Sequence, residues 1–248
     1  MSAAQADERK TASSKGVRGV IELFTSQGCS NCPAADAVLA RFAAKPNVVA
    51  LAYHVDYWDY IGWQDTLGSR RNAERQKGYT KALRLGALTT PQAIINGDTA
   101  LGGANEKEIA DALRRSRLPG ADGDPHVGLT LTGDTLRVEA KASFQDHPPV
   151  LILVTYSKET RTLVSRGENR GRHLVNIHAV RDWRAVGTLD AAGHLQVDMP
   201  IGLIADPDGH SGGSVALLQT MDEKDRPSRI LAAAVLEFNQ TEQVSSDR

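Results

Sequence analysis

The stretch that most constrains the fold of this chain is Val20–Pro33, with the sequence V-I-E-L-F-T-S-Q-G-C-S-N-C-P. An apolar run typical of a β-strand ends in a glycine-containing turn. Two cysteines follow, and then a proline that suits the first turn of a helix. Cys29 and Cys32 are the only cysteines among 248 residues. A Cys-x-x-Cys pair beside a strand–helix–strand pattern is typical of redox-active dithiols, so we expect these two residues to form the reactive centre.

The position of the pair predicts how the two thiols differ. Cys29 lies just before the first helical turn, where unpaired N–H groups and the helix dipole favour a thiolate. Such placement lowers a thiol pKa from about 8.5 to between roughly 3.5 and 7.5. Cys32 lies inside the helix and can attack a mixed disulfide on Cys29. Half of a zinc site and two structural cysteines are the alternatives, but zinc takes four ligands and no second Cys-x-x-Cys exists. We therefore predict no metal ligands, and no cofactor other than the Cys29–Cys32 disulfide itself.

The first half of the chain alternates strand and helix patterns, which implies a right-handed parallel crossover at its start. The expected elements are a strand at 18–24, a helix from the cysteines to Lys45-Pro46-Asn47, a buried strand at 48–55, a solvated helix from Ser69 to about Leu85, a hairpin turning at Asn96-Gly97, and a helix capped by Asn105.

The second half has a different period. Leu118–Pro125 has the composition of a linker, and beyond it apolar residues alternate with polar ones. About eight short strands with turn signals and no convincing helix predict an antiparallel β-sandwich. The candidate strands include 150–156, 162–165, 174–180 and 186–189. We therefore expect a disordered tail at 1–16, an α/β domain at 17–118 and an all-β sandwich domain at 125–240. A local group of arginines predicts a solvated sandwich face or a contact between the domains: Arg161, Arg166, Arg170, Arg172, Arg181 and Arg184.

Charge and hydropathy exclude some partners. Lysine and arginine number 29 against 30 aspartate and glutamate, so no nucleic-acid or anionic-membrane binding is expected. No window approaches the roughly 18 consecutive apolar residues of a membrane span. Ala4-Gln5-Ala6 has the small-x-small form of a signal-peptidase site. This favours a periplasmic or secreted protein, with a cytoplasmic one as the alternative, and the oligomeric state stays open.

Two resemblances follow from these motifs. C-S-N-C-P at the first strand–helix junction and Thr90-Pro91 before the third strand resemble the thioredoxin fold. Most of the chain also resembles the DUF1223 family of bacterial thioredoxin-like proteins, which often carry export signals. The stretches that carry this second resemblance are E-L-F-T-S-Q-G-C-S-N-C-P-A-A-D, H-V-D-Y-W-D-Y-I-G-W-Q-D, T-P-Q-A-I-I-N-G and N-I-H-A-V-R-D-W.

The resemblance to thioredoxin implies a thiol–disulfide oxidoreductase that acts on protein or small-molecule thiols and disulfides. It implies that Pro91 follows a cis peptide bond and lies against the dithiol, while the backbone of Thr90 pairs with the substrate. Gly28 replaces the family's tryptophan and Ser30-Asn31 replaces its Gly-Pro. These departures leave the reduction potential of the pair open.

Several further residues have candidate supporting roles. Glu22 is one position from where thioredoxins bury an acid, so it either relays protons or faces the other side of the sheet. Trp58 and Trp63 either line a substrate groove or pack the insert that contains them onto the fold. His54 and Asp56 support the site, with a hydrogen-bonded structural histidine as the simplest interpretation. Because thioredoxin-fold copper chaperones combine two cysteines with a histidine, the alternative function is a binding protein without turnover that holds copper or docks a partner.

Overall fold

The computed structural model describes residues 9–204 and 211–238, which form two β-sheets with three α-helices. In the first half the elements are β1 (Arg9–Ser13), β2 (Gly19–Thr25), α1 (Cys32–Ala43), β3 (Val48–His54), η1 (Asp59–Ile61), α2 (Arg70–Ala82), β4 (Gln92–Ile95), β5 (Thr99–Gly102), α3 (Glu106–Arg115) and η2 (Pro119–Asp122). In the second half they are β6 (His126–Thr132), β7 (Thr135–Lys141), β8 (Val150–Leu163), β9 (His173–Thr188), β10 (His194–Pro200), η3 (Ile201–Leu203), β11 (Ser211–Met221) and β12 (Pro227–Glu237). Within these ranges no helix is long and apolar enough to cross a membrane.

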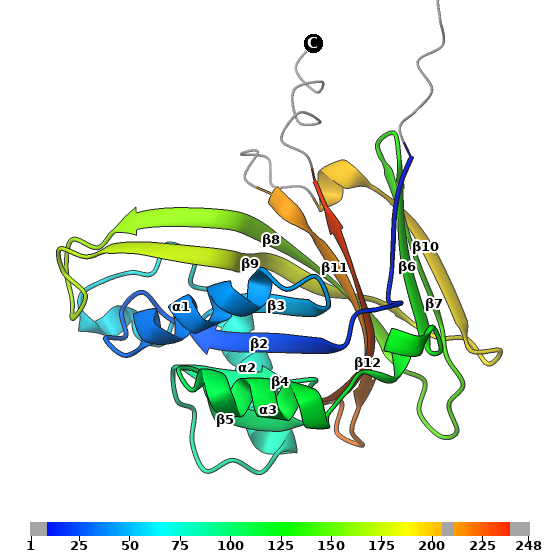
Figure 1. Ribbon diagram of the computed structural model, residues 1–248, viewed down its shortest axis with the longest axis horizontal. Helices are drawn as coiled ribbons and strands as arrows, with labels where there is room; N and C mark the ends of the chain where they lie inside the picture. Colours follow the sequence, from blue (N-terminus) through cyan, green and yellow to red (C-terminus); the bar gives the residue numbers. More distant parts are fainter. Residues whose placement is uncertain (1–8, 205–210, 239–248) are drawn as a thin grey trace, which may run out of the picture.

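The strand and helix order expected for the first half is confirmed. β2 and β3 are parallel and joined through α1, while β4 pairs antiparallel with both β2 and β5. α1 and α3 cover one face of this sheet and α2 packs on the other (Figure 1). Alternate residues of β2 pack on opposite faces of the sheet, because successive side chains of a strand point to opposite sides. Ile21 and Leu23 pack with α1, and Val20 and Phe24 pack with α2.

The segment expected to be a disordered tail contains a strand. β1 pairs antiparallel with β6, from Arg9 opposite Thr132 to Ser13 opposite Gly128. The prediction of disorder over 1–16 is therefore wrong for residues 9–13. Pairing at a sheet edge is made by backbone groups and needs no run of apolar side chains, so this polar segment gave no strand signal. Residues 1–8, with the Ala4-Gln5-Ala6 motif, lie outside the described residues.

The second half contains the expected antiparallel β-structure, but one of its two layers is shared with the first half. The four-stranded sheet β1-β6-β7-β10 packs on the part of the larger sheet formed by β8, β11 and β12. That larger sheet has eight strands in the order β12-β11-β8-β9-β3-β2-β4-β5, and β9 pairs in parallel with β3 at Ala179 and Ala52. A continuous sheet thus passes across the expected boundary, where η2 lies. The division into domains at 17–118 and 125–240 stays a prediction.

Two strands of the second half are longer than expected. β8 combines the strands predicted at 150–156 and 162–165, and β9 combines those at 174–180 and 186–189. The polar residues of β8 that follow Tyr156 lie where the β8–β9 hairpin extends past the sandwich and over α1 (Figure 1). The residues between the two apolar runs of β9, at 181–185, instead lie beside the part of β8 that also pairs with β11. The turn between the strands, residues 164–172, is called the hairpin tip below. This extension brings the second half to the Cys-x-x-Cys end of the first.

Candidate functional site

The two cysteines lie at the start of α1, as expected. Cys32 is the first residue of the helix, and its N–H donates to the carbonyl oxygen of Cys29 at 3.2 Å. Both are free thiols, Cys29 with 1% of its surface exposed and Cys32 with none. Ser30 and Asn31 between them are exposed. The dithiol therefore lies one layer beneath the surface, covered by side chains from other elements.

The surroundings of the two thiols shift their pKa values in opposite directions. A hydrogen bond from the Cys32 thiol is the largest effect on Cys29 and outweighs burial, so that the pKa of Cys29 falls to about 6. Hydrogen bonds with Thr90 and with the backbone at Asn31 and Cys32 add to this effect. Burial, followed by the hydrogen bond to Cys29 and its charge, raises the pKa of Cys32. At neutral pH Cys29 is the thiolate and Cys32 keeps its proton.

The loop before β4 faces the dithiol. The Thr90–Pro91 peptide bond is cis, which confirms that expectation, and the carbonyl oxygen of Thr90 lies 3.8 Å from Cys29 Sγ. The indole N–H of Trp58 donates to the Thr90 hydroxyl at 2.6 Å, so Trp58 covers the same loop. A side chain at Gly28 would bring its Cβ within 3.3 Å of Trp58 Cβ, tighter than most such contacts. Because Trp58 occupies the space beside the turn, glycine is favoured at the position before the first cysteine.

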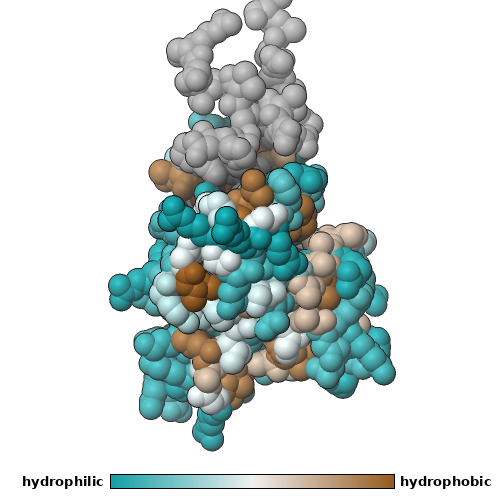
Figure 2. All heavy atoms as spheres, turned by 90° about the vertical axis from the view of Figure 1, so that its left-hand side faces the viewer, coloured by the Kyte–Doolittle hydropathy of each residue, from teal (hydrophilic) through white to brown (hydrophobic). Residues whose placement is uncertain are grey.

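The hairpin tip closes the site from the other side. The side-chain amide of Asn169, a fully buried residue, donates to the carbonyl oxygens of Gln27 and Cys29 at 2.8 and 2.9 Å. The Glu168 carboxylate accepts from the N–H of Ser30 at 3.1 Å. Figure 2 views this end of the molecule, where apolar and intermediate residues occupy the middle of the face and hydrophilic residues surround them. The second half of the chain therefore supplies part of the dithiol's enclosure.

Trp63 is fixed by the same hairpin. Its indole N–H donates to Gln27 Oε1 at 3.1 Å, while Gln27 Nε2 donates to Thr162 of β8 at 3.1 Å and to Asn176 of β9 at 3.3 Å. A Cβ on Gly167, in the hairpin tip, would lie 3.2 Å from Trp63 Cβ. These contacts favour the interpretation in which Trp63 packs the insert onto the fold.

An acid that the sequence analysis missed lies beneath Cys32. Asp36 is one turn further along α1, accepts from the Thr25 hydroxyl at 2.8 Å and accepts from the Asn176 amide at 3.2 Å. The Thr25 side chain also hydrogen-bonds with Cys32, so it connects the thiol to the carboxyl. Burial raises the pKa of Asp36 to about 6, although the charge of His54 and the hydrogen bond from Thr25 oppose this. An acid on the apolar face of a predicted helix, four residues after the second cysteine, was the available signal.

Glu22 faces the side of the sheet opposite to the dithiol. It belongs to the face of β2 that packs on α2, where its carboxylate pairs with Arg75 at 2.6 Å and accepts from the Tyr79 hydroxyl. Arg75 is only 4% exposed and also donates to Gln219 of β11 at 2.9 Å, so this residue of the largely solvated helix is buried, contrary to expectation. The proton-relay role proposed for Glu22 does not fit this position, because the dithiol lies on the opposite face of the sheet.

His54 and Asp56 differ in their relation to the site. His54 Nδ1 bonds to Asp65 Oδ2 at 2.8 Å with both side chains fully buried, which confirms the interpretation of His54 as a hydrogen-bonded histidine. Asp56 is partly exposed and no contact brings it to the cysteines. Over 9–204 and 211–238, no group of three or more His, Cys, Asp or Glu residues is arranged to hold a metal ion.

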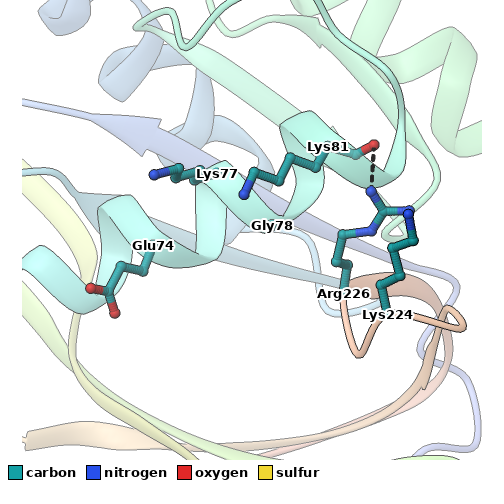
Figure 3. Close-up of a pocket in the computed structure, with 6 residues that line it drawn as sticks. All are labelled: Glu74, Lys77, Gly78, Lys81, Lys224 and Arg226. Atoms are coloured by element: carbon teal, nitrogen blue, oxygen red, sulfur yellow. Dashed lines mark hydrogen bonds between the residues drawn. The ribbon is translucent and has the colours of Figure 1, made fainter.

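A cavity of about 530 Å³ lies away from the dithiol, between α2 and the turn from β11 to β12 (Figure 3). Its lining residues are Glu74, Lys77, Gly78, Lys81, Lys224 and Arg226. Arg226 already donates to the carbonyl oxygen of Lys81 at 3.3 Å and pairs with Asp222. The cavity shares no residue with the dithiol site, so it is not part of the candidate site.

Comparisons with known proteins agree with this geometry. The DUF1223 family, described as "protein of unknown function", matches residues 20–219. Thioredoxin from Methanocaldococcus jannaschii is 32% identical over 96 residues, which cover 38% of this chain and 92% of that protein. A crystal structure of a protein from Agrobacterium tumefaciens matches with a TM-score of 0.76 and 34% identity, over 89% of this chain and 94% of that one. The chain therefore belongs to the DUF1223 family, with a thioredoxin-like N-terminal region that carries the Cys29–Cys32 pair and an additional antiparallel β-sheet region.

Proposed function

We propose that this protein is a thiol–disulfide oxidoreductase that works through Cys29 and Cys32. The observation that carries the proposal is the arrangement of a reduced pair at the start of α1. The two thiols are hydrogen-bonded to each other, and the Thr90 carbonyl lies 3.8 Å from Cys29 Sγ. The lowered pKa of Cys29 gives a nucleophile at neutral pH, and the raised pKa of Cys32 keeps the second thiol in reserve.

The exchange takes place in two steps. The Cys29 thiolate attacks one sulfur of a substrate disulfide, forms a mixed disulfide and releases the first substrate thiolate. Cys32 then loses its proton and attacks Cys29 Sγ, which forms the Cys29–Cys32 disulfide and releases the second substrate thiolate. The substrate gains two electrons and the protein loses them, and the reverse sequence oxidises a substrate dithiol. Thr25 and Asp36 form the path by which the Cys32 proton leaves, since the hydroxyl contacts both groups.

Substrate access requires a cover to move. Cys29 is only 1% exposed, and Trp58 and the hairpin tip lie on either side of it. Displacement of Trp58 from the Thr90 hydroxyl would free the loop at which a substrate backbone binds, as the resemblance to thioredoxin implies for Thr90 and Pro91. The substrate class is thus a protein or small-molecule disulfide or thiol that competes for these contacts.

The proposal is tested by redox titration with mass spectrometry of the alkylated protein. We expect an intramolecular disulfide with a midpoint between about −120 and −300 mV, the range of known oxidoreductases. A Cys32→Ser variant should accumulate a mixed disulfide on Cys29, and the matched Cys29→Ser variant should not, because burial raises the pKa of Cys32 and keeps this thiol protonated. A pair that forms no intramolecular disulfide anywhere in that range would refute the proposal.

The burial of Cys29 favours one second candidate, a binding protein that keeps the fold without turnover. Such a protein would hold its partner or a copper ion at a covered dithiol. Metal analysis of the reduced protein, with Cys29→Ser and His54→Ala variants, separates the two functions. Stoichiometric copper that is lost in both variants would favour the binding protein.

A further inference from the structure

A buried histidine–aspartate pair lies on the same side of the sheet as Asp36. His54 Nδ1 and Asp65 Oδ2 are 2.8 Å apart, and neither side chain reaches solvent. Asp65 also accepts hydrogen bonds from the N–H groups of Gln27 at 2.7 Å and Leu67 at 2.9 Å, so both of its carboxylate oxygens have hydrogen-bond donors. A buried ion pair is maintained where further hydrogen bonds satisfy its charges, as they do here.

The imidazole lies on the sheet face that also carries Thr25. Thr25 and His54 are neighbours across β2 and β3, so their side chains share one face of the sheet. On that face Thr25 donates to Asp36 at 2.8 Å. His54 Nε2 is buried and has no hydrogen-bond partner within the described part of the chain, although the charges of His54 and Asp36 interact. The pair therefore acts on Asp36 through its field and not through a direct hydrogen bond.

We propose that the His54–Asp65 pair keeps Asp36 ionised at neutral pH, so that Asp36 accepts through Thr25 the proton that Cys32 loses. This inference rests on the proposed function and deepens it, because it assigns a positioning role to a histidine that touches neither sulfur. Asp65 holds the imidazolium in its protonated form, the imidazolium favours the Asp36 carboxylate, and that carboxylate is the base for the second step of the exchange.

The charges around the pair have the required signs. Burial lowers the pKa of His54, but the charge of Asp65, its hydrogen bond and the charge of Asp36 outweigh burial, and the net pKa is raised. The charge of Arg181 of β9 opposes this. For Asp36 burial raises the pKa to about 6, and the positive charge of His54 is the largest effect that lowers it. Loss of His54 would therefore leave Asp36 protonated over more of the neutral range.

The proton and electron balance of the step is complete. The Cys32 S–H proton passes to the Thr25 oxygen as the Thr25 hydroxyl proton passes to Asp36. The Cys32 thiolate then bonds to Cys29 Sγ, and the bond between Cys29 and the substrate sulfur breaks. The substrate thiolate leaves with the electron pair of that bond. The substrate disulfide is the oxidant, and no other reactant is required.

Stopped-flow reaction of the reduced protein with the aromatic disulfide dithionitrobenzoate resolves the two steps. Cys29 releases one thionitrobenzoate when it attacks, and Cys32 releases the second when it displaces the mixed disulfide. In the wild type the rate of the second release should rise through about pH 6, with Asp36. In His54→Gln this rise should move upward by about one pH unit, since an opposite charge at close range shifts a pKa by roughly 1 to 3.

A double-mutant cycle with Asp36→Asn separates a positioning role from a merely structural one. We expect Asp36→Asn to lose the rise near pH 6, and His54→Gln to cause no further displacement in that background. Superimposable profiles for the wild type and His54→Gln would overturn the inference, as would an equal displacement in both backgrounds. Absence of any second release, with no disulfide formed in the wild type, would overturn the proposed function instead.

A measurement on the wild type covers the case in which His54→Gln does not fold. Nuclear magnetic resonance of the histidine rings should show His54 protonated at pH 7 in the reduced protein. His178 is the internal control and should be neutral, because burial lowers its pKa and none of the described carboxylates bonds to it. A neutral His54 at pH 7 would overturn the inference.

Discussion

Replacement of Asn169 by alanine tests whether the hairpin tip holds the Cys-x-x-Cys turn. The Asn169 amide donates to two carbonyl oxygens, those of Gln27 and Cys29. Cys29 O keeps a second donor, the N–H of Cys32 at 3.2 Å, whereas Asn169 is the one donor to Gln27 O that the described residues provide. Inside the protein the variant therefore loses one shared hydrogen bond and leaves one buried carbonyl without a partner. The hydrogen bond from Arg172 to Asn169 Oδ1 is also lost, but Arg172 is exposed and water can replace this partner.

The expected magnitude follows from these two losses. A shared hydrogen bond contributes about 0.5–1.5 kcal/mol, and a buried group left without a partner costs about 1–3 kcal/mol. Asn169→Ala should therefore lower the free energy of unfolding by about 2–4 kcal/mol. For a chain of this size that corresponds to a fall in Tm on the order of 10 °C. Because the tip also covers Cys29, the rate of its alkylation by iodoacetamide should rise in the native protein.

Urea denaturation and alkylation kinetics measure both effects. The matched control is Arg170→Ala, a change at the neighbouring exposed residue of the same turn, which should alter the stability by less than about 0.5 kcal/mol. Reduced stability with unchanged alkylation would mean that the tip holds the turn but does not limit access. If Asn169→Ala matches Arg170→Ala in both stability and alkylation, the clamp described for the hairpin tip is refuted.

Three further predictions concern other parts of the structure. Glu22→Gln should lower the free energy of unfolding in urea by about 3–5 kcal/mol, because it leaves the buried Arg75 cation uncompensated. Adding Arg75→Met should restore much of the lost stability. Equal stability of Glu22→Gln and the wild type would contradict the ion pair. Gly103→Ala should lower the free energy of unfolding by about 1–3 kcal/mol, since its Cβ would lie 2.6 Å from Leu23 Cδ1. The control Gly102→Ala meets no atom within 4 Å and should leave the stability nearly unchanged. Similar urea midpoints for the two variants would refute the close approach at Gly103. The alkylation rate of Cys29 should be half-maximal near pH 6 and should decrease at lower pH as the thiolate is protonated. A rate that keeps rising to about pH 8.5 would show that the pKa of Cys29 is not lowered.

Local sequence patterns were sufficient for the part of the site built from neighbouring residues. The strand before the cysteines and the proline at the start of α1 each specify a backbone geometry over a few residues, and these geometries were confirmed. The cis bond at Thr90-Pro91 was implied by the resemblance to the thioredoxin fold, and it was confirmed as well. Glu22 and Asp36 show the limit of the same approach. The strand period placed Glu22 one residue out of phase with the dithiol, and the acid beneath Cys32 came from the helix.

The sequence by itself determined the reactive pair, its position at the beginning of a helix and the change from helical to strand periods near residue 120. Only the tertiary structure determined what surrounds the pair, because Asn169, Glu168 and Asn176 reach it across 138 to 142 residues of intervening chain. Such contacts depend on how far the β8–β9 hairpin extends and on its pairing with β3. Side-chain period specifies which face of a strand is buried, but it does not specify which distant element covers that face.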